Sequence, residues 1–290
     1  MASAEVRQIR RRIRSVQSTM KITRAMELIA TSRIAKAQVR VAQSKPYTQK
    51  MADVIRNIAA ASGGLRHPML ERREVRTVGV LVVTSDRGLA GGYNASVIRL
   101  AERAMAAHRA DGLQTRLYAI GKKAQGYFRY RKYVLEQSFL GVTDTPGYGD
   151  ARAIANVLLN DYEEGVIDSV EVFTTRFVSA LTQNAGLWPL LPIEPPDMEA
   201  ATTGSGYTFE PSPEEILTRL LPRYLEGTVF GILLEASASE HAARRRAMKA
   251  ATENAEELTR LLTRQANQAR QAEITTEISE IVGGAEALSG

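Results

Sequence analysis

The chain has 290 residues and a net charge of +6, and 44% of its residues are hydrophobic and 24% charged, an ordinary composition for a globular protein. It contains no cysteine, which excludes disulfides, thiol nucleophiles and zinc–thiolate sites. No apolar run approaches the ~20 residues that a membrane-spanning helix needs, and no apolar segment follows the basic N-terminus as it would in a secretory signal.

The net positive charge of the chain comes from its first segment. Residues 1–62 contain 13 basic and 3 acidic residues, a net charge of +10, whereas the remainder of the chain is slightly acidic. A surface this basic indicates an acidic partner, which is a nucleic acid, an anionic lipid or an acidic protein surface.

The same segment, 1–62, predicts one long coiled-coil helix. Residues 1–45 contain neither glycine nor proline. Apolar or small residues recur there at intervals of three and four, which is the seam of a helix that packs on another helix. The expected seam residues are Ile9, Ile13, Val16, Met20, Thr23, Glu27, Ala30, Ile34, Ala37, Val41, Met51, Ile55 and Ile58.

The middle of the chain, 70–212, predicts a separate domain in which strands alternate with helices. Strands are expected at 75–84, 113–120, 133–140 and 169–177, and helices at 96–110, 122–131 and 150–164. This alternation is typical of a doubly wound, Rossmann-like α/β domain. Four prolines, Pro189, Pro192, Pro195 and Pro196, are expected to mark its exit, with a loop over 202–213.

The last segment, 213–290, predicts a helix that pairs antiparallel with 1–62. Pro222, Gly227 and Gly231 are expected to interrupt it, and the long uninterrupted part follows over 232–282, which lacks glycine and proline. The expected seam residues are Met248, Ala251, Ala255, Leu258, Leu262, Gln265, Ala269 and Ala272. The fold class is therefore α/β plus an antiparallel coiled coil.

The glycine-rich turn at 84–94 is a candidate ligand-binding or catalytic site. Turns of this kind at the end of a strand can bind phosphate through their backbone amides. The spacing matches neither a P-loop nor a dinucleotide motif, and Ser85 and Asp86 have no evident histidine partner. We expect a structural turn rather than a ligand site.

The histidines and the arginine runs give no clearer indication of a metal, catalytic or nucleic-acid site. His67, His108 and His241 show no metal-ligand spacing, so the sequence predicts no metal site, no cofactor and no catalytic residue. The runs at 10–12 and 244–246 are either solvated, or nucleic-acid patches, or a collar that meets acidic protein. No aromatic residues interleave with them, which weakens the nucleic-acid interpretation.

Four segments, in order from about residue 5 to 288, resemble the gamma subunit of F-type ATP synthases. They contain KITRAME at 21–27, SDRGLAGG at 85–92, SEHAAR at 239–244 and EIVGGA at 280–285. The family pattern usually has cysteine where Ala90 stands, which excludes a thiol role at that position.

The resemblance implies a non-catalytic central-stalk rotor subunit. It would couple proton-driven rotation of a membrane ring to ATP synthesis or hydrolysis in the hexamer of alpha and beta subunits. The implied partners are alpha, beta, epsilon and the ring of c subunits, with no nucleic acid and no direct nucleotide binding. The implied location is peripheral, on the cytoplasmic face of a bacterial cell membrane.

The resemblance also transfers shaft-to-stator contacts onto matching positions. On the N-terminal helix these are Lys21, Arg24 and Met26, and on the C-terminal helix Arg244, Gln271, Thr275 and Glu280. On this basis Arg244→Ala is expected to alter coupling more than folding. Two alternatives stay open: a helical nucleic-acid or adaptor protein that uses the basic N-terminal helix, and an enzyme that uses the turn at 85–94.

Overall fold

The computed structural model describes residues 4–61, 67–193, 210 and 212–289. Pro195, Pro196 and most of the loop expected over 202–213 lie outside these residues. The chain forms two compact units. Unit 1 contains residues 1–30 and 245–290, and unit 2 contains residues 31–244.

The centre of unit 2 is a five-stranded sheet with the order β3-β2-β1-β4-β5. The strands are β1 (Thr77–Val83), β2 (Gln114–Ile120), β3 (Leu135–Phe139), β4 (Ser169–Phe177) and β5 (Gln183–Leu191). The first four are parallel, and β5 is antiparallel to β4 at one edge. The expected α/β domain is confirmed, but the sequence missed β5. Pro189 lies within β5, which an edge strand tolerates because one side of its backbone needs no partner.

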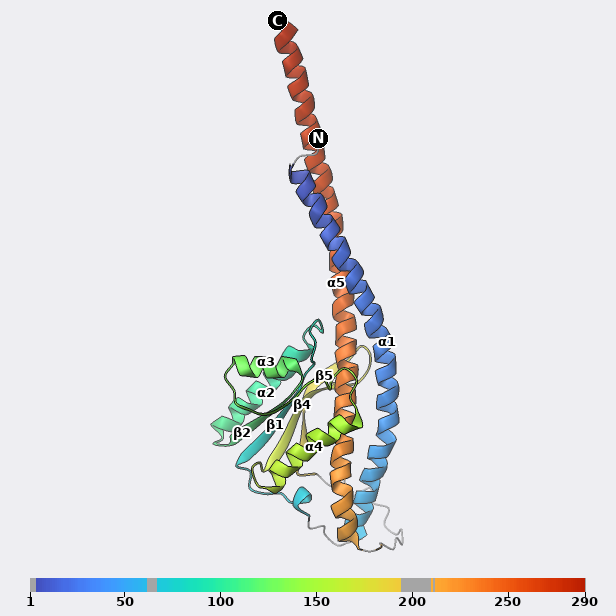
Figure 1. Ribbon diagram of the computed structural model, residues 1–290, viewed down its shortest axis with the longest axis vertical. Helices are drawn as coiled ribbons and strands as arrows, with labels where there is room; N and C mark the ends of the chain where they lie inside the picture. The colour runs from blue at the N-terminus through green and yellow to red at the C-terminus, as the bar shows by residue number, and fades with distance from the viewer. Residues whose placement is uncertain (1–3, 62–66, 194–209, 211, 290) are drawn as a thin grey trace. The chain divides into compact units, whose positions relative to one another are not determined.

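Helices cover both faces of this sheet (Figure 1). They are α2 (Tyr93–Ala110), α3 (Lys122–Tyr130) and α4 (Tyr148–Glu163), with a short 3-10 helix, η1 (Pro68–Leu70). On one face, α2 and α3 pack on alternate residues of β1, including Val78, Val80 and Val82. On the other face, α4 and the long helices pack on Leu81 and Val83. Alternate strand residues therefore serve two separate cores, as the pleat requires.

The two long helices are α1 (Ala4–Ala61) and α5 (Pro213–Ser289). Within unit 2 they run antiparallel and side by side (Figure 1), since Ala37 and Val41 of α1 pack with Leu234 and Ala238 of α5. The expected interruption of α5 is wrong, because the helix continues through Pro222, Gly227 and Gly231.

Packing explains why α5 continues. Its residues Leu221, Leu225, Val229 and Leu233 recur at intervals of four and are each at most 1% exposed. A proline or glycine inside a helix costs about 1–3 kcal/mol, and burial of several leucine-sized side chains outweighs that cost.

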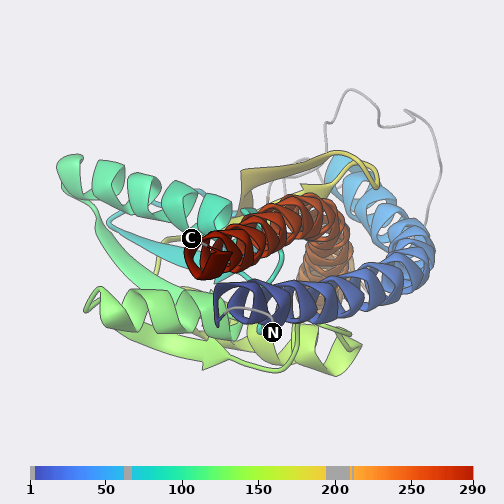
Figure 2. The same cartoon turned by 90° about the horizontal axis from the view of Figure 1, so that it is seen from above.

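In unit 1 the two helices form a narrow seam and also lie side by side (Figure 2). The expected seam of α1 is confirmed at Thr23 and Ala30, which are 8% and 1% exposed. The expected register of α5 is wrong at every second position. Its seam residues with low exposure are Met248, Thr252, Ala255, Leu262 and Ala266, whereas Leu258 is 38% exposed.

A buried hydroxyl pair explains the register. The Oγ1 atoms of Thr23 and Thr252 lie 2.7 Å apart, and each also lies within hydrogen-bond distance of a carbonyl of its own helix. Each hydroxyl has one proton, so one threonine donates to the other, and the other donates to its own backbone. The seam therefore accepts threonine at 252 in place of the expected Ala251.

Candidate functional site

The expected contact residues fall into two groups on unit 1 and one position on unit 2. Lys21 and Arg24 are exposed on α1, one turn apart, and Met26 is half-buried. On α5, Gln271, Thr275 and Glu280 are all exposed, and the Thr275 hydroxyl donates to the Gln271 carbonyl at 2.9 Å.

These groups lie far apart along the helix pair. Thr23 lies opposite Thr252, so the antiparallel pairing brings Lys21 and Arg24 near that level of α5. The segment of α5 from 274 to 285 is exposed at every residue, and Figure 1 shows it extending past the start of α1. The structure thus places these side chains on two separate surfaces, and their contact with a partner stays a prediction.

Arg244 lies in a different environment from the other expected contact residues. It is only 8% exposed, and its Nη2 lies 2.6 Å from Oε1 of Glu240 on the preceding turn of α5. Nη2 also donates to the Gly88 carbonyl at 3.3 Å. A buried cation with this ion pair supports the fold directly, so Arg244→Ala is expected to destabilise the fold as well, and its effect on coupling stays a prediction.

Around Arg244 lies an ion-pair cluster of Arg33, Asp144, Glu240, His241 and Arg244. Arg33 of α1 donates to both carboxylate oxygens of Asp144. His241 approaches Asp144 at 3.9 Å through Nε2 and Arg244 at 3.3 Å through Nδ1. The cluster therefore links α1, the segment after β3 and α5 through charged side chains.

Burial controls the protonation of this cluster. Burial, followed by the charge of Arg244, lowers the pKa of His241 from 6.5 to about 4. Burial raises the pKa of Glu240, although Arg244 opposes the change. Burial also acts to raise the pKa of Asp144, but the hydrogen bond and charge of Arg33 outweigh it and leave that pKa below its usual value.

The same three acceptors have the composition of a metal site, but their surroundings oppose one. Asp144, Glu240 and His241 each present a ligand atom within 4.8 Å of the others. Arg33 already pairs with Asp144, and Arg244 already pairs with Glu240. A metal ion would meet two adjacent guanidinium charges, so the arrangement favours an ion-pair cluster over a metal centre.

The glycine-rich turn after β1 is filled by contacts within the chain. Oδ1 of Asp86 accepts from the Lys122 amide at 3.1 Å, and Oδ2 accepts from the Gly141 amide and the Thr143 hydroxyl. Ser85 Oγ donates to the Arg87 carbonyl at 2.5 Å. These bonds occupy the acid and the hydroxyl, which favours the structural interpretation of the turn over a catalytic one.

The turn and its neighbours also hold the long helices. Tyr93 donates its hydroxyl to the Ala236 carbonyl at 3.1 Å, and Ser239 donates to the Thr175 carbonyl at 3.2 Å. Arg40 of α1 donates to the Pro146 carbonyl. Together with the ion-pair cluster, these bonds form what we call the helix–sheet junction. Sequence reasoning missed it, because tyrosine, serine and arginine on helices give no local signal of a distant carbonyl partner.

Comparison with known proteins identifies the family. The family model described as ATP synthase (ATP-synt) matches residues 5–288. A protein of Parafrankia sp. (strain EAN1pec) named ATP synthase gamma chain is 47% identical over 295 residues, which cover 99% of each chain. The proteins of that name from Mycolicibacterium smegmatis and Desulfitobacterium hafniense are each 46% identical and align over 99% of this chain and 99% and 100% of their own lengths.

Solved structures agree at the level of the fold. A chain of the Euglena gracilis mitochondrial ATP synthase (OSCP/F1/c-ring) superposes with a TM-score of 0.68 at 17% identity, covering 98% of this chain and 94% of its own. A chain of the Tetrahymena thermophila mitochondrial ATP synthase (central stalk/c-ring) superposes with a TM-score of 0.61 at 23% identity, and the alignment covers 79% of this chain and 99% of that chain. The long helices, the sheet and the near full-length sequence match therefore lead to one conclusion: the chain belongs to the ATP synthase gamma chain family.

Proposed function

We propose that this chain transmits torque between a membrane-embedded ring and the catalytic subunits of an ATP synthase, and performs no nucleotide chemistry itself. Family membership makes the chain a central-stalk rotor subunit. The proposal also names the partners and the location. The partners are the proton-driven c ring, the hexamer of alpha and beta subunits, and epsilon, and the location is the cytoplasmic face of a bacterial membrane.

One observation carries the proposal: α1 and α5 are each bonded to the sheet domain at several points of the helix–sheet junction. Arg33 and Arg40 fix α1 to the segment at 144–146, and Tyr93 and Ser239 fix α5 to the turn and to β4. A rotor needs such cross-links, because torque applied to one element reaches another only through contacts that resist shear.

The state of the candidate catalytic groups supports a non-catalytic role. Ser85 and Asp86 are bonded to groups of their own chain, and His241 lies in the ion-pair cluster. Among the described residues no helix is both long and apolar enough to cross a membrane. A peripheral subunit that acts through other subunits agrees with these findings.

The exposed surfaces of unit 1 supply the proposed contacts with the catalytic subunits. Lys21 and Arg24 lie on the segment of net charge +10 and suit an acidic partner surface. Gln271, Thr275 and Glu280 lie on α5 where every described side chain from 274 onward is exposed. A single exposed pair adds only about 0–1 kcal/mol, so coupling requires many such contacts acting together.

Reconstitution tests the proposal. The purified chain alone should hydrolyse no ATP, whereas its addition to alpha and beta subunits, epsilon and membrane vesicles with the c ring should restore ATP-driven proton pumping. Thr275→Ala should lower pumping per ATP, and Thr263→Ala is the matched control, because Thr263 is also exposed and bonds the carbonyl one turn back at 2.8 Å. Proton pumping that persists without this chain would overturn the proposal.

A further inference from the structure

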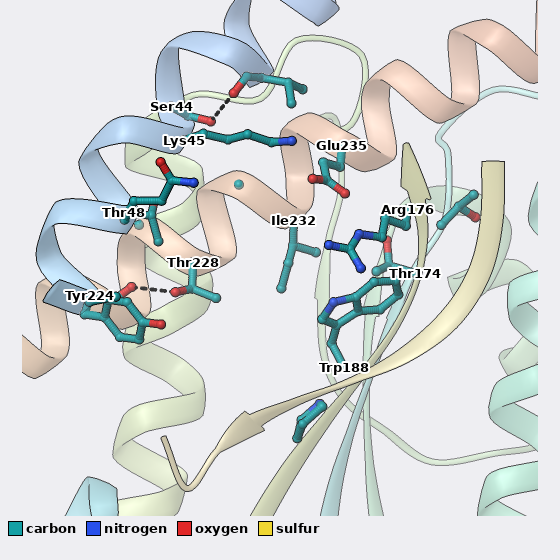
Figure 3. Close-up of a pocket in the computed structure, with 17 residues that line it drawn as sticks. Ser44, Lys45, Thr48, Thr174, Arg176, Trp188, Tyr224, Thr228, Ile232 and Glu235 are labelled. Carbon is teal, nitrogen blue, oxygen red and sulfur yellow. Dashed lines mark hydrogen bonds between the residues drawn. The ribbon is translucent and has the colours of Figure 1, made fainter. Parts of the chain in front are cut away.

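A pocket of about 410 Å³ lies in unit 2, outside the ion-pair cluster around Arg244. Side chains of α1, β4, β5 and α5 line it (Figure 3). Its volume is within the range of small-molecule sites, about 300–1,000 Å³. Its walls are mixed, with Trp188, Pro189 and Ile232 among the apolar residues.

Three charged side chains converge on the pocket from three elements. Lys45 comes from α1, Arg176 from β4 and Glu235 from α5, and Figure 3 shows their charged ends directed toward the same space. Among the described residues none of the three forms an ion pair, although opposite charges stand close by. Two cations and one carboxylate give the pocket lining a net positive charge.

One hydroxyl group in the pocket wall also lacks a partner. The Oγ1 atom of Thr174, which shares a face of β4 with Arg176, is buried and has no hydrogen-bond partner among the described residues. The residue itself is 3% exposed. Other hydroxyls of the wall are satisfied, since Ser44 donates to the Val41 carbonyl and Thr228 to the Tyr224 carbonyl. Buried polar groups are normally paired, so an unpaired hydroxyl beside a cavity indicates a missing partner.

We propose that this pocket binds a small phosphate monoester that carries a hydroxyl group. Arg176 and Lys45 suit a doubly charged oxyanion, since guanidinium and ammonium groups form the strong, charge-assisted bonds that phosphate prefers. Glu235 accepts a hydrogen bond from the hydroxyl of the ligand and disfavours a bare anion. Thr174 donates to a remaining oxygen once a small movement of the wall exposes its hydroxyl.

Trp188 gives the test a direct signal. It is the only tryptophan of the chain, and it lines the pocket with the Arg176 guanidinium 5.8 Å from its ring centre. A ligand that draws Arg176 toward its phosphate changes the surroundings of this one fluorophore. The full-length chain would be titrated with glycerol 3-phosphate, inorganic phosphate and sodium chloride at constant ionic strength, with tryptophan emission and calorimetry as readouts.

We expect a saturable change with glycerol 3-phosphate, weaker binding of inorganic phosphate, and none with chloride. Lys45→Gln and Arg176→Gln should each raise the dissociation constant for glycerol 3-phosphate about tenfold or more. Fluorescence can report on Lys45→Gln, but Arg176→Gln changes the surroundings of Trp188 directly, so its dissociation constant is measured by calorimetry. Glu235→Gln should lower the dissociation constant for inorganic phosphate, so that the affinities for inorganic phosphate and glycerol 3-phosphate become more similar. Lys36→Gln is the matched control, because Lys36 is also exposed on α1 of unit 2 but does not line the pocket.

Two results would overturn the proposal. One is emission that changes linearly with all three salts, which marks a general ionic effect. The other is binding that saturates but stays unchanged in both Lys45→Gln and Arg176→Gln, which places the ligand elsewhere. Neither result bears on the torque-transmitting role, because proton pumping in the reconstituted complex tests that role separately.

Discussion

The helix pair of unit 1 allows a sharp test with two leucines one turn apart on α5. Leu262 is 2% exposed in the seam, whereas Leu258 is 38% exposed beside it. Hydropathy spacing alone places both in the seam. The substitutions Leu262→Ala and Leu258→Ala remove the same atoms from the same helix, so they differ only in the packing of the side chain.

The expected costs follow from burial. Replacement of a fully buried leucine by alanine costs about 2.7–5 kcal/mol, and less where the surroundings can close the cavity. A seam between two helices has solvent on both sides and can relax, so we expect about 2–3 kcal/mol for Leu262→Ala. Leu258→Ala removes a side chain that is already largely in water and should cost less than about 1 kcal/mol.

Hydrogen exchange measures these costs locally. Residues 4–30 and 245–270 belong to a compact unit of their own, so exchange of their backbone amides reports on the opening of the helix pair more directly than a global melting curve. A difference of about 2 kcal/mol corresponds to roughly thirtyfold faster exchange through opening in Leu262→Ala than in Leu258→Ala. Equal protection in the two variants, or a larger loss in Leu258→Ala, would refute the register built on Thr252.

Three further outcomes follow from unit 2. Arg244→Ala leaves the Glu240 carboxylate buried without its cation and should cost about 3–5 kcal/mol by denaturant unfolding. Burial lowers the pKa of His241 from its ordinary 6.5 to about 4 in the folded chain. Neutral His241 therefore contributes fully to the free energy of unfolding above pH 6.5, and this contribution, at most about 3 kcal/mol, is lost as the pH falls toward 4. Gly121→Ala should destabilise the chain by more than about 2 kcal/mol, because φ is +89° and the new Cβ would lie 2.3 Å from the Thr84 carbonyl oxygen.

Each of these outcomes has a control. Arg219→Ala on the exposed face of α5 should change the unfolding free energy by less than about 0.5 kcal/mol, and a comparable loss in both arginine variants would contradict the buried ion pair. His241→Gln should flatten the pH dependence of stability between 6.5 and 4, although the raised pKa of Glu240 acts in the opposite direction. Gly149→Ala meets nothing within 4 Å and is the control for Gly121→Ala.

The strands and helices of the sheet domain were predictable because their signals are local. The run that forms β1 is almost entirely β-branched and apolar, as a strand covered on both faces must be. The edge strand β5 lacks such a run, since its burial alternates irregularly and Pro189 lies within it. Its pairing with β4 depends on a partner that is distant in sequence.

The long helices show where local signals stop. Pro222 and two glycines favoured a break in α5, but the same stretch buries Leu221, Leu225, Val229 and Leu233 in the core of unit 2, and this tertiary packing keeps the helix continuous. The register of the seam depends on a threonine pair, because the hydroxyls of Thr23 and Thr252 form a hydrogen bond to each other. A pattern of apolar residues does not predict such a bond. Arginine is usually exposed, so nothing in the sequence marked Arg244 as buried.

Rotation of the chain inside its complex is the most direct test. The chain contains no cysteine, so a single one introduced by Tyr130→Cys, at a side chain that is 84% exposed, gives a unique attachment point for a probe. The alpha and beta subunits would be fixed to a surface, and ATP added. Stepwise, one-directional rotation of the probe that stops when ATP is exhausted is the predicted result. ATP hydrolysis at the full rate with a stationary probe would contradict a rotor function.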